Sequence, residues 1–101
     1  MNLFEELYNV ELPGLDTIDE QENPEAIAHF TDSIGRYHWY VVAGNELCNG
    51  DVELFCLVKL LTVEFGMCNL SQLQEIGVIQ DKEWKPKGMY DIREELKERE
   101  E

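Results

Sequence analysis

Alternating apolar and polar residues predict two neighbouring strands in the middle of the chain. Residues 37–43 divide into two sets that would point to opposite faces of a pleated strand, and most of them are aromatic or β-branched. One set is Tyr37, Trp39, Val41 and Ala43, and the other is His38, Tyr40 and Val42. Residues 44–51 are expected to connect this strand to the next, with a tight turn at 49–51.

Residues 52–63 form the longest apolar segment, and they fit both a strand and a helix. As a strand, the segment is largely apolar on both faces, which predicts a central strand covered on both sides. Leu54, Leu57, Val58 and Leu61 also fall at helical spacing. The tight turn that precedes the segment favours the strand, because such turns join antiparallel neighbours.

Three further segments have the spacing of helices with one buried side. Residues 2–9 and 70–76 are short, whereas residues 89–101 form a longer, charged helix. Asn2 is the expected cap of the first helix, Asn69 or Ser71 caps the second, and Gly77 ends it. The apolar residues expected on the buried sides are Leu3, Phe4, Leu7 and Tyr8, then Leu70, Leu73 and Ile76, then Ile92 and Leu96.

Shorter strands complete the prediction of an α+β fold. Residues 26–31 are expected to form a strand that a turn at 32–35 joins to the central pair, and residues 78–84 to form an edge strand. Residues 64–66 are expected to interrupt the sheet, 67–68 to resume it, and 86–88 to form a loop. A chain of 101 residues, 44% of them hydrophobic, suits one domain with its own core.

We therefore predict a single compact α+β domain over residues 1–101, with a mainly antiparallel sheet of about four strands flanked by short helices. Its parts are an N-terminal helix (1–9), an acidic irregular segment (10–25), a sheet core with one short helix (26–85) and a charged C-terminal helix (89–101).

The charged residues are unevenly distributed. The chain has 22 Asp and Glu against 8 Lys and Arg, a formal net charge of −14. No Lys or Arg precedes Arg36, whereas nine acids do. Those nine acids are Glu5, Glu6, Glu11, Asp16, Asp19, Glu20, Glu22, Glu25 and Asp32. This charge argues against direct binding of nucleic acid or anionic lipid through phosphates, and it favours a basic protein surface as partner.

The charge density of the acidic segment is comparable with that of nucleic acid. It holds six carboxylates between Glu11 and Glu25, and duplex DNA carries about one charge per 1.7 Å. Carboxylates so arranged can bind the Lys and Arg of a groove that normally holds nucleic acid. The residues expected to contact such a partner are Glu5, Glu6, Glu11, Asp16, Asp19, Glu20, Glu22 and Glu25. The alternative is that the acids only keep the protein soluble.

The residue types that carry catalysis or bind metals form no recognisable motif. The histidines and cysteines contain no Cys-x-x-Cys or His-x-x-x-His pair, and Cys56 is expected to be a small core residue. Acidic neighbours of Cys48 disfavour its thiolate, and the chain has no glycine-rich phosphate loop or G-x-S-x-G elbow. We therefore expect no catalytic residue, no metal, no cofactor and no enzyme activity.

Cysteine usage indicates the compartment. The odd number of cysteines, three, and the absence of an apolar leader at Met1 predict free thiols in a reducing cytosol. The longest apolar run is broken by Lys59 and is shorter than the ~20 residues that a membrane span needs. No membrane partner is expected.

Two groups of rings each have two interpretations. His29 and His38, on neighbouring predicted strands, fit a pH-sensitive pair, or one exposed and one hydrogen-bonded histidine. Tyr37, Trp39 and Tyr40 fit packing in the core, or an aromatic interface with a partner or a second copy.

A series of short motifs resembles a family of small bacterial and phage-borne domains of unknown function, number 2958, from about Leu12 to Trp84. The motifs are Leu12-Pro13-x-Leu15, Pro24, His29-Phe30-Thr31, Trp39-Tyr40-Val41, Leu54-Phe55-x-x-Val58, Glu64-Phe65-Gly66 and Leu70-x-x-Leu73-x-x-Ile76. The chain departs from the family pattern at His29–Asp32 and in the connection 45–51. The resemblance implies a phage, plasmid or integrated-element context with no established enzymatic role, a setting in which small acidic proteins commonly disarm host defence nucleases.

The predicted function is therefore a non-enzymatic, anti-CRISPR-like inhibitor. It would bind the basic nucleic-acid groove of a host defence complex by carboxylate mimicry of phosphate. The alternative is a self-associating or regulatory interaction module that uses the aromatic sheet patch. An enzyme is the third hypothesis, and it would require a pocket in which His38 and carboxylates converge.

Overall fold

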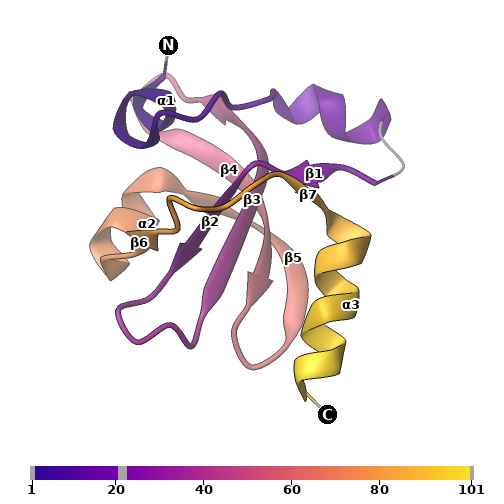
Figure 1. Cartoon of the computed structure of the whole chain (residues 1–101). Helices are drawn as coiled ribbons and strands as arrows, with labels where there is room; N and C mark the ends of the chain where they lie inside the picture. Colours follow the sequence, from indigo (N-terminus) through magenta and orange to yellow (C-terminus); the bar gives the residue numbers. More distant parts are fainter. Residues whose placement is uncertain (1, 21–22, 101) are drawn as a thin grey trace.

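Five antiparallel strands in the order β5-β4-β3-β2-β6 form the main sheet of the protein (Figure 1). The computed structural model describes residues 2–20 and 23–100, and their side chains except those of 18–20 and 98–100. The strands of the main sheet are β2 (Ala28–Thr31), β3 (His38–Glu46), β4 (Val52–Lys59), β5 (Val63–Asn69) and β6 (Ile79–Gln80). A second sheet pairs β1 (Glu25–Ala26) with β7 (Lys87–Gly88).

Helices cover both faces of the main sheet. They are α1 (Leu3–Tyr8), the 3-10 helix η1 (Leu15–Glu20), α2 (Leu70–Ile76) and α3 (Met89–Glu100). One core cluster packs α1 and α2 against the face that carries Phe30, Trp39 and Leu54. The other packs α3 against the face that carries Tyr40 and Leu57. The single α+β domain with an antiparallel sheet is thus confirmed, with five strands in the sheet where about four were expected.

The helix predictions hold closely at their ends. Asn2 caps α1, accepting a hydrogen bond from the Glu5 N–H at 3.0 Å. Asn69 rather than Ser71 is the cap of α2, and Gly77 ends that helix in the left-handed conformation with φ 82°. Ile92 and Leu96 are buried on α3 as predicted. Leu7 and Ile76, in contrast, are 50% and 55% exposed, because each lies at the outer end of a helix too short to bury its whole apolar side.

Residues 52–59 form a strand, so the strand prediction for this segment is confirmed and the helix alternative is wrong. It lies between β3 and β5 and has buried side chains on both faces, as a central strand should. The segment does not continue to Val63, because residues 60–62 form the turn into β5. Residues 64–66 therefore do not interrupt the sheet but lie inside β5.

A β-bulge changes the face of one predicted core residue. Val41 is opposite Cys56, whereas Ala43 is opposite Phe55, so β3 holds one extra residue at Val42. Ala43 consequently packs in the cluster under α3 and not with Trp39 and Val41, as strict alternation predicted.

Several predicted boundaries are wrong because pairing with distant segments decides where these strands begin and end. Gly44 to Glu46 belong to β3 rather than to a connection, and residues 86–88 include β7. The strand expected over 78–84 contains only Ile79–Gln80. The strand expected over 26–31 is divided into β1 and β2, and the segment 10–25 contains η1 and the start of β1.

Close backbone approach anchors the acidic segment to the sheet. The Gly44 N–H donates to the Pro13 carbonyl oxygen at 2.8 Å, and Leu12 is buried beside it. A Cβ at residue 44 would collide with the Glu53 carbonyl oxygen and would meet Leu12 and Leu54 at 3.0 Å. Glycine is thus needed there by space, and this contact fixes where the segment leaves the sheet.

Within the part of the chain that the structure describes, no helix is long and apolar enough to span a membrane.

Candidate functional site

The acidic N-terminal part of the chain lies along one end of the molecule. Figure 1 shows α1 and η1 at the same end of the sheet, opposite the turns that join β2 to β3 and β4 to β5. Hydrogen bonds fix this arrangement. The Leu15 N–H donates to the Asn45 side-chain oxygen at 3.3 Å, and the Met89 N–H donates to the Pro24 carbonyl at 3.0 Å. We call the described residues of this end, 3–20 and 23–25, the acidic edge.

Four of the acids predicted to contact a partner are exposed on the acidic edge: Glu6, Glu11, Asp16 and Glu25. Glu5 differs, because its carboxylate accepts hydrogen bonds from the Leu12 N–H at 3.0 Å and the Asn2 N–H at 3.4 Å. Glu5 therefore links α1 to the segment that follows it, and its main role is structural. The side chains of Asp19 and Glu20, and all of Glu22, lie outside the described residues.

Basic side chains come from the later part of the chain. Arg36 is in the turn between β2 and β3, Lys59 ends β4, and Arg93 and Lys97 are on α3. The turns after β2 and β4, and with them Arg36 and Lys59, are at the end opposite α1 and η1 (Figure 1), whereas Lys87 on β7 lies opposite Ala26 of β1. Lys82 lines a hollow together with Tyr8 and Val10, so lysines from the later part of the chain border the acidic edge.

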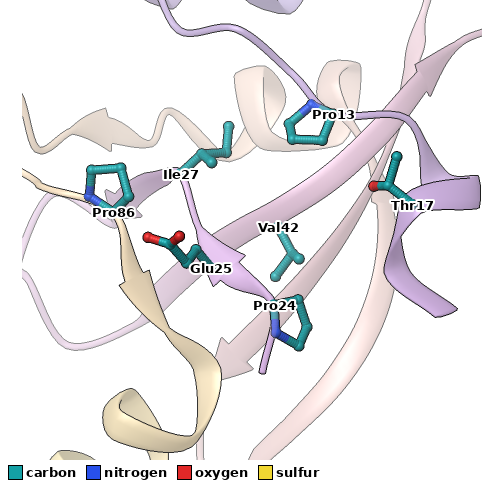
Figure 2. A pocket seen from close by; sticks show the side chains of 7 residues that line it. All are labelled: Pro13, Thr17, Pro24, Glu25, Ile27, Val42 and Pro86. Carbon is teal, nitrogen blue, oxygen red and sulfur yellow. The ribbon is translucent and has the colours of Figure 1, made fainter. Parts of the chain in front are cut away.

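A hollow of about 290 Å³ opens where the acidic edge meets the sheet. Figure 2 shows its lining, which comes from the chain before β1, from β1 and the residue after it, from β3, and from the residue before β7. Three proline rings, two branched aliphatic side chains and two polar residues form the wall. They are Pro13, Pro24, Pro86, Ile27, Val42, Thr17 and Glu25. We call this hollow the proline pocket.

The aromatic interface predicted at Tyr37, Trp39 and Tyr40 is wrong for two of the three residues. Trp39 is 6% exposed and Tyr40 is 4% exposed, so neither offers appreciable surface to a partner. They lie in opposite core clusters because they alternate along β3. Tyr37 is half-buried, with the Arg36 guanidinium 5.6 Å from its ring centre. Packing in the core is thus confirmed for Trp39 and Tyr40.

His29 and His38 lie on neighbouring strands and contact each other directly. His29 Nε2 is 2.9 Å from His38 Nδ1, and His29 Nδ1 is 2.9 Å from the Asp81 carboxylate. The His29 ring stacks on Tyr40 with centroids 4.6 Å apart. With His29 neutral, its Nδ1–H donates to Asp81 and its Nε2 accepts from the Nδ1–H of His38. The sequence indicated the pairing of the histidines, but no local signal pointed to Asp81, 52 residues away.

This network has a pH dependence whose sign follows from Asp81. The hydrogen bond from His29 lowers the pKa of the Asp81 carboxyl below its usual value. A lowered folded-state pKa contributes stability above about pH 4, and that contribution is lost as the pH falls through the folded-state value. Asp81→Asn is therefore expected to cost about 0.5–1 kcal/mol at pH 7, a modest figure because the side chain is 35% exposed.

Urea denaturation at pH 7 and pH 3 measures this effect. The stability difference between wild type and Asp81→Asn should be smaller at pH 3 than at pH 7, because the contribution of the Asp81 charge is lost as the pH falls through its lowered folded-state pKa. Glu94→Gln, at an exposed position on α3, serves as the control and should not reproduce this convergence. An Asp81→Asn difference that is the same at both pH values would contradict the assignment.

All three cysteines are free thiols: Cys48 is exposed, and Cys56 is buried in the core as predicted. The Cys56 and Cys68 sulfurs are 3.8 Å apart across β4 and β5. The hydrogen bond to Cys68 and burial both raise the pKa of Cys56, and the same bond lowers the pKa of Cys68.

Among the described residues, no three His, Cys, Asp or Glu side chains are placed to hold a metal ion.

Comparison of the chain with protein-family models, with curated proteins and with solved structures found no match. The resemblance to the family of unknown function therefore stays a prediction, and the case for function depends on the acidic edge and the proline pocket. The sequence indicated the first through its charge. It did not indicate the second, because the three prolines lie up to 73 positions apart, from Pro13 to Pro86.

Proposed function

We propose that this protein is a non-enzymatic inhibitor that binds the basic nucleic-acid groove of a host defence complex through the acidic edge. The observation that carries the proposal is a group of exposed carboxylates in the part of the chain that contains no Lys or Arg. Glu6, Glu11, Asp16 and Glu25 are exposed at one end of the molecule, and no Lys or Arg precedes Arg36. Carboxylates grouped in this way are suited to a groove lined by Lys and Arg.

Mimicry of phosphate explains how such a surface could act without catalysis. A nucleic-acid groove presents Lys and Arg at positions set by the phosphates that it binds. Carboxylates accept the same charge-assisted hydrogen bonds, so a protein that supplies them competes with the nucleic acid. Inhibition then requires only occupancy, and the long-range field of a chain with net charge −14 speeds the encounter.

The class of target follows from the resemblance of the sequence to mobile-element domains, which favours a CRISPR effector, acting in the cytoplasm of a bacterial host. The experiment measures association with a purified CRISPR effector as NaCl is raised from 50 to 500 mM, by biolayer interferometry. We expect an association rate that falls by about tenfold or more, because the steering field is screened. Binding that is absent at low salt, or that does not change with salt, would contradict the proposal.

A second candidate function is supported by the exposed apolar residues of β5. This strand is at the edge of the sheet, with β4 as its one neighbour, and Phe65 and Met67 are 43% and 51% exposed. Such an edge can pair with another strand, including that of a second copy. Self-association through β5 would replace the aromatic patch that the sequence suggested at Trp39 and Tyr40.

Light scattering coupled to size exclusion separates the two candidates. We expect a monomer at 50 mM NaCl, because two copies with a charge of −14 each repel one another. A dimer that dissociates on Met67→Lys but not on Leu7→Lys, which is equally exposed on α1, would favour the second candidate instead.

A further inference from the structure

The proline pocket borders the acidic edge. Its lining combines apolar side chains with one carboxylate, so it can select a ligand by shape as well as by charge. We propose that it takes one arginine side chain of the basic partner, with the stem against the apolar wall and the guanidinium at the Glu25 carboxylate. This inference rests on the proposed function for the identity of the partner. The pocket itself is defined by the fold and can be tested without a partner.

The size of the pocket fits a single side chain. Its volume of about 290 Å³ lies at the lower limit of the ~300–1,000 Å³ that small-molecule sites occupy. Three proline rings limit the freedom of the wall, because each ring fixes its own φ angle. The wall is also anchored on both sides: Pro13 accepts from Gly44 at 2.8 Å, and Pro24 accepts from Met89 at 3.0 Å. A preformed hollow of this kind costs little ordering when a side chain enters.

The polar groups of the pocket select a cation. Its three prolines have no N–H. The Thr17 hydroxyl donates to the Gly14 carbonyl at 2.7 Å, and the Ile27 N–H donates to the Val41 carbonyl at 2.8 Å. These donors are therefore already engaged, and the charged group of the lining is Glu25, which is exposed at the mouth. An anion would be repelled by this carboxylate.

An arginine side chain matches both the apolar residues and the carboxylate of the lining. Its apolar stem can lie along Ile27, Val42 and the proline rings, and its flat guanidinium is weakly hydrated and can bind a carboxylate through two parallel hydrogen bonds. Figure 2 shows the side chains of Glu25, Ile27 and Val42 around the same space. The nearby cation Lys87 has its own partner, since its ammonium donates to Glu95 at 2.7 Å.

An NMR titration of the protein with N-acetyl-arginine amide tests the assignment. The methyl groups of Ile27 and Val42 line the pocket and report on its occupancy. We expect saturable shifts at these methyls with a dissociation constant of about 1–10 mM, which suits one small ligand. N-acetyl-citrulline amide has almost the same shape without the charge, and it should bind at least about fivefold more weakly.

Two variants make the outcome decisive. Glu25→Gln should weaken the arginine probe about fivefold, whereas Glu6→Gln, which removes an exposed carboxylate on α1, should leave it unchanged; the spectra also show that both variants are folded. Equal binding of citrulline, an unchanged affinity in Glu25→Gln, or the absence of saturable shifts at both methyls would overturn the assignment. Failure to bind a defence complex would overturn the proposed function alone, because this titration needs no partner protein.

Discussion

Phe30→Ala is expected to lower the free energy of unfolding by about 3–5 kcal/mol. Phe30 is fully buried on β2, where its ring lies edge-on to Tyr8 at 4.7 Å and to Phe4 at 6.0 Å. Removing the ring leaves a cavity between α1 and the sheet, and it also removes the contacts that hold this short helix in place. A loss of that size is a large part of the ~5–15 kcal/mol that stabilises a typical domain.

Urea denaturation of Phe30→Ala and a matched variant measures the effect. Phe65→Ala removes the same atoms from β5, where the ring is 43% exposed and stacks on Phe55 at 5.5 Å. The control should lose about 1 kcal/mol, since less apolar surface leaves a packed environment. Equal losses in the two variants would mean that the aromatic contacts of α1 do not stabilise the fold as described.

Neutralising the exposed acids of the acidic edge is expected to weaken binding to a CRISPR effector by about 100-fold at 50 mM NaCl. The variant replaces Glu6, Glu11 and Glu25 with Gln and Asp16 with Asn, all at exposed positions. Four carboxylate contacts at about 0.5–1 kcal/mol each give about 2–4 kcal/mol, and every 1.4 kcal/mol is tenfold in affinity. Most of the loss should vanish at 500 mM NaCl, where such contacts are screened.

The control removes the same amount of charge from other surfaces. Glu64, Glu75, Glu83 and Glu94 are exposed on β5, on α2, after β6 and on α3, and all four become Gln. Net charge rises equally in both variants, so a difference between them reports where the charge lies. Only the first variant should lose affinity strongly, and thermal denaturation should show that both are folded. Equal losses would assign the effect to net charge rather than to the acidic edge.

The main strands could be predicted because their signals are local. Val52 to Lys59 are apolar on both faces, and the tight turn at 49–51 precedes them, so the choice of strand over helix needed no distant information. The helix ends at Asn2 and Gly77 were likewise set by the residues themselves, through a side-chain acceptor and a left-handed backbone.

The remaining features depend on partners that are distant in the sequence. The bulge at Val42 is a property of the register between β3 and β4, and alternation along one strand cannot reveal it. Gly44 remains in β3 because Glu53 and Leu54 approach it closely, although glycine by itself suggests a turn. The pairing of Glu25 with Gly88, which brings Glu25 and Pro86 to one pocket, joins residues that have no local signal in common.

The candidate site also combines features that the sequence predicts with features that depend on distant residues. Charge could be counted from the sequence, and the exposed positions of Glu6, Glu11, Asp16 and Glu25 agree with that count. Glu5 could not be separated from them, because its role depends on the Leu12 N–H seven residues later. The aromatic residues of β3 had the spacing of either a core or an interface. Helices from both ends of the chain bury Trp39 and Tyr40, so these two residues belong to the core.

The most direct test of mimicry is competition with nucleic acid for one groove. A fluorescent duplex is bound to a purified CRISPR effector, and its anisotropy is followed as this protein is added at 100 mM NaCl. Binding in the groove predicts complete release of the duplex, at concentrations of the protein that rise in proportion to the concentration of duplex. A ternary complex in which the duplex stays bound, or an effector that this protein does not bind, would contradict the account.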